Sequence, residues 1–456
     1  MLDQKIPDTI IKVRDSAAKK GVKALFRMHR EKSHLIRIGN NSVSLNTSED
    51  LTRLDVEVID GRREGSCTLL GDLEGPGIIE NALQVAVTKA AVATPKVYEP
   101  IERVIENEIE EENQFDQAIE ELDSGLKVDT YSAIMKSVGE DYNYSGSWSS
   151  GSTEIFLSGT ANDKFAWRIG TDQQFNSVLK HPEEKWELAD FQSGWQVGDV
   201  TAEATVEKYL DLIEVFKKPG IRVEPGRYTV LFGAQALAEI LQMLIWTGLH
   251  GRHHEEKIGW MSEKKAGDKI LSDKITIIDD PANLHTFSFG FDLNGLSRHT
   301  FLFIEEGVLK NLFYDLDTAG KYGKKPTPHS GSLSAVMRAG EGLTNPFEAA
   351  RNMGRVLYIP ALHYINIPNM SKGLFTGSSR FSAILLENGE AAGPIFSTRI
   401  TDTFQNVFSN VEILSRANLS ANVSNTYGRR MPEAFAVPSY MISNEVKITD
   451  SAESFQ

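Results

Sequence analysis

The stretch VLFGAQALAEILQMLIWTGLHGR, residues 230–252, predicts a helix that is buried along one face. Its apolar and small residues recur at steps of three and four, as on the inward face of a helix. They are Leu237, Ile240, Leu241, Leu244 and Gly248. Gly233 stands just before the helix, and Gly251 belongs to the glycine pair that is typical of a helix C-terminus.

This helix has the frame of a zinc site but none of the side chains that hold zinc. A metallopeptidase helix carries two His on neighbouring turns and a Glu beside the first, which supply two nitrogen ligands and a general base. The corresponding stretch here reads QMLIWT, residues 242–247. An amide, a thioether and a hydroxyl are poor substitutes for that ligand set.

At these residues the chain resembles the TldD/PmbA family, also called TldD/TldE and long labelled modulators of DNA gyrase. The catalytic branch of that family carries HExxxH within VLGA…LLHE…GHGLEGD, and this chain reads LFGA…ILQM…WTGLHGR. The resemblance implies that Gln242 replaces the first ligand His, Met243 the Glu, and Thr247 the second His. The catalytic branch also uses a C-terminal Cys as third ligand, whereas the only Cys here is Cys67. The chain therefore looks like the TldE/PmbA branch, with no catalytic, cofactor or metal residues.

Trp246 stands where the catalytic branch has Gly, directly before the second ligand. Two His five residues apart lie about 140° apart on an ideal α-helix, so the helix must distort before both can reach one ion. We expect the bulky Trp246 to oppose that distortion. We also expect Met243, Leu244 and Trp246 to be packed in the core.

The resemblance continues along nearly the whole chain. Five further segments follow the family pattern in order, mostly through turn glycines and apolar strand residues. These are residues 37–67, 152–163, 269–281, 291–323 and 373–390.

The sequence predicts an α+β fold in three parts. Residues 1–98 form an N-terminal α+β domain, residues 99–222 a central region, and residues 223–456 a β-rich C-terminal domain of the TldD/PmbA type, the expected dimer contact. Within these parts we expect helices at 6–20, 77–92, 201–220 and near 344–354, and a strand meander across 154–198 behind a Gly/Ser-rich lead-in. The acidic block 101–124 keeps apolar residues at helical spacing, which predicts an exposed helix.

Composition argues against nucleic-acid binding, an internal disulfide and a membrane span. The 456 residues carry a net charge of −15, from 63 acidic against 48 basic residues, without the basic stripe that phosphate binding requires. We therefore expect no direct contact with nucleic acid. A single Cys excludes an internal disulfide, and no apolar run approaches the roughly 20 residues of a membrane span. These features predict a cytoplasmic protein.

Three other places offer candidate chemistry. HGRHHEE, residues 250–256, gathers His250, His253 and His254, which could hold a metal but are expected in a solvated loop. Cys67 is expected in the core, and Asp279–Asp280 before Pro281 as turn residues.

The resemblance implies a non-catalytic subunit of a TldD/TldE-type zinc metallopeptidase that degrades unfolded peptides. Its partner would be a TldD-like catalytic chain in a heterodimer, with a homodimer formed in isolation. Two alternatives remain open: a self-sufficient hydrolase with a metal relocated to the His cluster, and a stand-alone peptide-binding scaffold. A TldD-like chain carrying HExxxH and encoded beside this one would favour the subunit.

Overall fold

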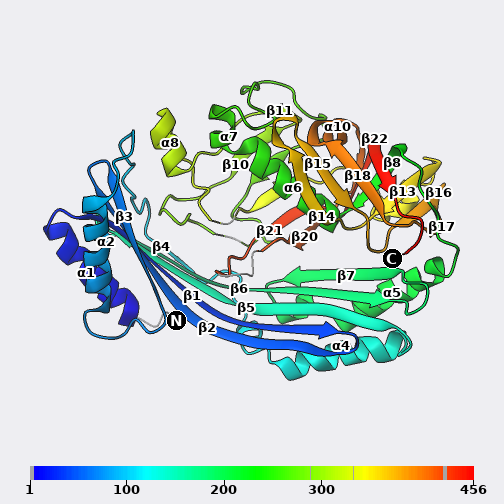
Figure 1. Ribbon diagram of the computed structural model, residues 1–456, viewed down its shortest axis with the longest axis horizontal. Helices are drawn as coiled ribbons and strands as arrows, with labels where there is room; N and C mark the ends of the chain where they lie inside the picture. Colours follow the sequence, from blue (N-terminus) through cyan, green and yellow to red (C-terminus); the bar gives the residue numbers. More distant parts are fainter. Residues whose placement is uncertain (1–4, 288, 332, 425–428, 456) are drawn as a thin grey trace.

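The computed structural model describes residues 5–287, 289–331, 333–424 and 429–455. It confirms an α+β fold: a long curved sheet from the N-terminal half is overlaid by a β-rich C-terminal half (Figure 1). Among the described helices, none combines the length and the apolar character needed to cross a bilayer.

The first sheet has the order β3-β2-β1-β5-β6-β4, with β7 paired to β6. Its strands are β1 (Lys23–Gly39), β2 (Ser42–Asp60), β3 (Arg63–Leu70), β4 (Ile109–Glu111), β5 (Asn143–Gly159), β6 (Phe165–Lys180) and β7 (Glu187–Gly194). Because β1 pairs with both β2 and β5, this sheet contains strands from both sides of residue 98, where the N-terminal domain was expected to end.

Helices cover the two ends of this sheet (Figure 1). At one end lie α1 (Lys5–Lys19) and α2 (Ile78–Val92); at the other lie α4 (Ser124–Val138) and α5 (Ala202–Phe216). The helices expected at 6–20, 77–92 and 201–220 are thus confirmed, because their apolar faces seal separate parts of the core.

Residues 101–124 do not form the expected exposed helix. The segment is extended, β4 pairs in parallel with β6, and only the four-residue α3 (Gln117–Glu120) is helical. Ile105 is fully buried beside Leu25 and Leu157. Pairing with an existing sheet therefore overrides the helical spacing of the acidic block.

The expected strand meander is present as β5, β6 and β7. The Gly/Ser-rich stretch before residue 154 is not a lead-in, however, because it is the first half of β5. Its glycines allow close approach of neighbouring chains: a Cβ on Gly151 would lie 2.4 Å from the carbonyl oxygen of Lys32. The expected helix near 344–354 is reduced to α9 (Pro346–Ala349).

The C-terminal half contains two sheets. The six-stranded sheet has the order β11-β10-β9-β12-β21-β20, and the nine-stranded sheet the order β14-β15-β18-β22-β8-β13-β16-β17, with β19 paired to β22. Their strands are β8 (Gly226–Gly233), β9 (Ile277–Asp279), β10 (Phe301–Glu305), β11 (Val308–Leu309), β12 (Ala335–Met337), β13 (Arg355–Ile359), β14 (His363–Asn369), β15 (Leu374–Ser378), β16 (Ile384–Glu387), β17 (Glu390–Pro394), β18 (Thr398–Thr403), β19 (Val411–Leu414), β20 (Asn418–Asn422), β21 (Ala434–Pro438) and β22 (Tyr440–Ser451).

The helix α6 (Ala234–Leu244) contacts strands of both sheets, β20 and β21 on one side and β8, β14 and β22 on the other. Short helices α7 (Gly251–Glu255), α8 (Leu316–Tyr322) and α10 (Phe404–Ser409) complete this half.

Candidate functional site

The helix α6 is buried as its sequence predicts. It follows β8 directly, and the buried face Leu237, Ile240, Leu241 and Leu244 has no exposed surface. Gly233 marks the junction, where a Cβ would lie 2.9 Å from the Cα of Pro360. The helix is therefore held in one position by the strands around it.

The helix leaves α-helical geometry at the degenerate motif. Residues Ile245–Leu249 form a π-helical turn, a rare geometry that is frequently found at functional sites. Thr247 lies within this turn and Gln242 in the α-helix just before it, so the helix is distorted within the motif. Trp246 does not prevent this distortion, so that expectation is wrong.

Trp246 is also not packed as expected. Its side chain is 49% exposed, while Leu244 is fully buried and Met243 is partly buried against the core. The π turn rotates residue 246 outward, and the Trp246 ring lies against His253, 6.0 Å between centroids. The indole therefore covers the surface of the turn.

Two of the three motif side chains, those of Gln242 and Thr247, are held by hydrogen bonds. Gln242 Nε2 donates to Glu433 Oε2 at 3.3 Å, and Thr247 Oγ1 donates to the Met243 carbonyl at 2.7 Å. Glu433 lies just before β21 and also accepts from the Leu333 amide at 2.8 Å. Burial raises the pKa of Glu433 to about 7.

This donor set does not fit zinc. The ion is bound by thiolate, imidazole and carboxylate groups, usually three or four together. Around the motif, Glu433 is the one carboxylate contacting Gln242, and the other motif groups are an amide, a thioether and a hydroxyl.

We predict that the purified chain carries well under one zinc per molecule, because no ligand set at Gln242, Met243 and Thr247 can retain the ion. Elemental analysis after chelator-free purification tests this. A full equivalent of zinc that is lost on His253→Ala or His254→Ala would contradict it and move the site to the His cluster.

The His cluster forms a short helix, α7, rather than the expected solvated loop. His250 Nδ1 accepts the Arg252 amide at 3.1 Å, its Nε2 lies 3.4 Å from Asp315, and His254 Nδ1 lies 3.2 Å from the Met261 carbonyl. His253 packs on Trp246. Within the described part of the chain, no three His, Cys, Asp or Glu side chains converge as a metal site.

The remaining candidates are structural. Cys67 is buried in β3, as expected. Asp280 is a turn residue whose Oδ1 accepts the Ala282 amide at 3.3 Å. Asp279 instead ends the buried strand β9, and both its oxygens accept from Arg298 Nη2 at 2.7 Å, so that half of the turn expectation is wrong.

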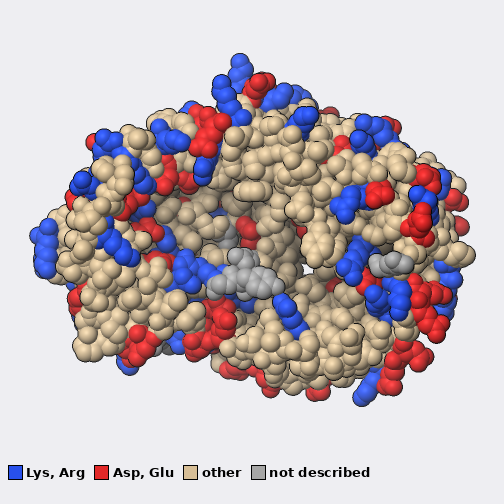
Figure 2. All heavy atoms as spheres, viewed as in Figure 1, with Lys and Arg blue, Asp and Glu red and all other residues tan. Residues whose placement is uncertain are grey.

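A polar layer that the sequence did not indicate joins the N-terminal sheet to the C-terminal half. Arg430 forms two hydrogen bonds with Asp172 in β6, both at 2.8 Å, and its amide donates to Glu31 in β1. His29 Nε2 lies 2.8 Å from the Arg430 carbonyl, and burial lowers the pKa of His29 to about 4. These partners are far apart in sequence, so no local pattern reveals them. Figure 2 shows the molecule hollowed between these two halves, with acidic and basic side chains interspersed.

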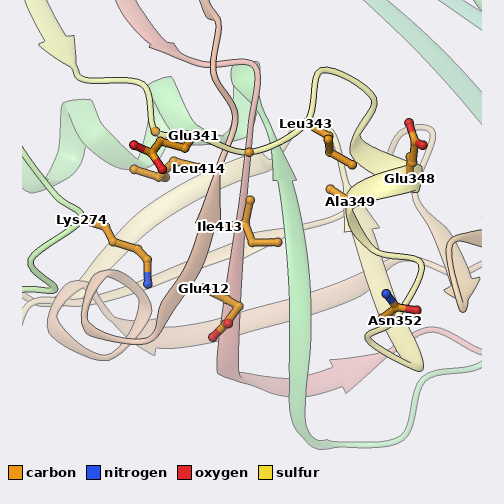
Figure 3. A pocket seen from close by; sticks show the side chains of 11 residues that line it. Lys274, Glu341, Leu343, Glu348, Ala349, Asn352, Glu412, Ile413 and Leu414 are labelled. Atoms are coloured by element: carbon orange, nitrogen blue, oxygen red, sulfur yellow. The ribbon is translucent and has the colours of Figure 1, made fainter.

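Two cavities could hold a ligand. One, of about 540 Å³, lies between the first sheet and the C-terminal half and includes Arg298. The other, of about 590 Å³, lies beside β19 (Figure 3). It has an apolar centre at Leu343, Ile413 and Leu414 and includes none of the motif residues.

Comparison with known proteins identifies the class. The sequence pattern of the PmbA/TldA metallopeptidase C-terminal domain matches residues 225–449. A metalloprotease of Methanothermobacter thermautotrophicus is 25% identical over 191 residues, 40% of this chain and 42% of that protein. Metalloprotease PmbA of Escherichia coli O157:H7 is 28% identical over 160 residues, 34% of each chain. The chain thus spans less than half the length of these curated relatives.

Solved structures share the whole fold. TldE from Thermococcus kodakarensis superposes with a TM-score of 0.81 at 16% identity, covering 97% of this chain and all of that one. A modulator of DNA gyrase from Thermotoga maritima gives 0.79 at 16% identity, covering 98% and 100%. The fold and the helix that carries the altered motif define a metallopeptidase-like chain. The protein belongs to the TldD/PmbA family.

Proposed function

We propose that this chain is the non-catalytic, TldE/PmbA-like subunit of a TldD/TldE-type peptidase. The observation that carries the proposal is the contrast at α6: a π turn distorts the helix within the motif, whereas Gln242, Met243 and Thr247 cannot hold zinc or activate water. A TldD-like partner supplies the zinc ion and the general base.

The role of this chain in the pair is to enclose the partner's site and to admit unfolded peptide. Extended chains can bind by hydrogen bonding to an exposed sheet edge, and a sheet-rich subunit offers such edges. The C-terminal domain is the proposed contact with the partner, and a homodimer replaces the heterodimer in isolation. The proposal places the pair in the cytoplasm, in keeping with a single, buried cysteine.

The contacts of the His cluster give no support to a self-sufficient hydrolase. His250 and His254 contact different partners, Asp315 and a backbone carbonyl, and no three potential ligands converge there among the described residues. A stand-alone scaffold is the alternative that the test below separates from the subunit.

We expect cleavage of an unfolded peptide only when a TldD-like chain is present. The isolated chain, and its Gln242→His/Met243→Glu/Thr247→His variant, should leave a casein-derived peptide uncut, because the third ligand is still absent. Adding a TldD-like chain should give cleavage that a chelator abolishes, and the two chains should co-purify. Chelator-resistant cleavage by the repurified isolated chain would refute the proposal, and a partner fully active without this chain would favour the scaffold.

A further inference from the structure

The cavity between the first sheet and the C-terminal half contains hydrogen-bond donors without acceptors. It is lined by Glu111 at the end of β4, by Trp195 beyond β7, and by Arg298. Pro281, Ala282, Leu284 and Gly290 complete this part of the lining. The Arg298 side chain is only 1% exposed. Its Nη2 donates to Asp279, but its Nε is enclosed and has no partner among the described residues.

A second buried guanidinium belongs to the residue that pairs with Glu111, one of the residues that line this cavity. Arg168 is 2% exposed and stacks on Phe289 at 3.6 Å from the ring centroid. It sits opposite Glu111 in the pairing of β4 with β6, and its Nε and Nη1 have no partner in the described parts of the chain. Buried N–H groups in native proteins are hydrogen bonded in the great majority of cases. Three nitrogen donors lacking acceptors in one region therefore indicate acceptors that come from outside the chain.

The local charges decide what kind of acceptor fits. Asp279 is paired with Arg298, and Glu111 stands opposite Arg168, so the site is close to neutral without a ligand. A carboxylate would add an uncompensated buried negative charge, which is costly. A neutral carbonyl oxygen accepts the same hydrogen bonds without adding charge. Trp195, Pro281 and Leu284 supply apolar surface at the rim, and Leu284 is 72% exposed.

We propose that this cavity binds an uncharged, extended stretch of polypeptide, with a backbone carbonyl oxygen accepting from Arg298 Nε. This inference rests on the proposed function and names a substrate subsite for it. Arg298, which lines the cavity, is held by Asp279 at the end of β9, and Asp279 also accepts from the Ser334 amide next to Leu333, whose amide donates to Glu433. Glu433 in turn accepts from Gln242, so a chain of hydrogen-bonded residues links the cavity to the altered motif.

The test is fluorescence anisotropy of the full chain with a labelled ten-residue peptide of Gly, Ser, Ala, Gln and Phe, acetylated and amidated. Saturable binding is expected. Ala282→Trp, at an exposed lining position, should fill the cavity and weaken binding at least tenfold. Arg298→Lys, which keeps the charge for Asp279 but removes the Nε donor, should do the same. The matched control Leu343→Trp, in the cavity beside β19, should leave the affinity unchanged.

Two results would overturn the subsite: no saturable binding by folded wild-type chain at millimolar peptide, or equal affinity in wild type and Ala282→Trp with unaltered circular dichroism. Tighter binding of the same peptide with a free carboxylate, by tenfold or more, would also overturn it in favour of an anion site. Partner-dependent cleavage measured in parallel separates the two proposals. Cleavage without binding removes only the subsite, and binding without cleavage removes only the subunit role.

Discussion

Replacing Arg430 by alanine is expected to destabilise the protein by about 3–5 kcal/mol, the range for breaking a buried ion pair. Asp172, with no exposed surface, would keep its charge without the guanidinium that pairs with it. The Arg430 guanidinium also donates to Ser149 at 2.7 Å, so the segment before β21 would lose its side-chain hydrogen bonds to the first sheet, while the residue 430 amide would still donate to Glu31. Urea unfolding at pH 7 measures the change.

Two variants separate the buried charge from the loss of packing. Arg430→Met combined with Asp172→Leu removes both charges and should recover much of the stability, because the cost lies in the unpaired carboxylate. Arg429→Ala breaks the neighbouring pair with Asp55, where the arginine side chain is 23% exposed, and should cost about 1 kcal/mol or less. An unchanged unfolding midpoint for Arg430→Ala would show that Asp172 is hydrated or otherwise paired.

Glu239→Gln is expected to stabilise the protein at pH 8 by about 2 kcal/mol and to leave stability near pH 4.5 unchanged. Burial raises the pKa of Glu239 from 4.5 to about 7. A carboxyl whose pKa is raised by folding contributes stability that is complete below its ordinary pKa and lost as pH rises through the raised value. Each unit of pKa shift corresponds to about 1.4 kcal/mol of unfolding free energy. Because Glu239 is partly exposed, the expected gain of the Gln variant is smaller than the full shift would give.

The geometry around Glu239 suits an uncharged amide. Gln235 Nε2 donates to its Oε1 at 3.0 Å, and the Leu362 backbone approaches the carboxylate, but the enclosed Oε2 has no hydrogen bond of normal geometry among the described residues. Glu433→Gln is the matched control, because burial also raises the pKa of Glu433 to about 7 but both of its oxygens accept N–H donors. That variant should gain little. Urea unfolding from pH 4.5 to 8 compares them, and a constant difference between Glu239→Gln and wild type at all pH values would contradict the titration.

The sequence determined the features that depend on neighbours along the chain. The three- and four-residue spacing of Leu237, Leu241 and Leu244 fixed which face of α6 is buried. The loss of the metal ligands is a property of side-chain type alone, readable at Gln242, Met243 and Thr247. The order of motifs from residue 37 to residue 390 indicated the family, because a shared fold constrains many turns and strands together.

Only the tertiary structure decided how distant segments meet. Helical spacing in 101–124 was overridden because β6 offered hydrogen bonds to β4 and the core accepted Ile105. The π turn exposed Trp246, which composition alone placed inside. Arg430 and Asp172 are 258 residues apart, and Arg298, in the connection before β10, is 19 residues from Asp279 at the end of β9, so both pairings depend on how the chain folds back. Local periodicity sets which face of an element is apolar, whereas burial of charge depends on which partner the fold brings within hydrogen-bonding distance.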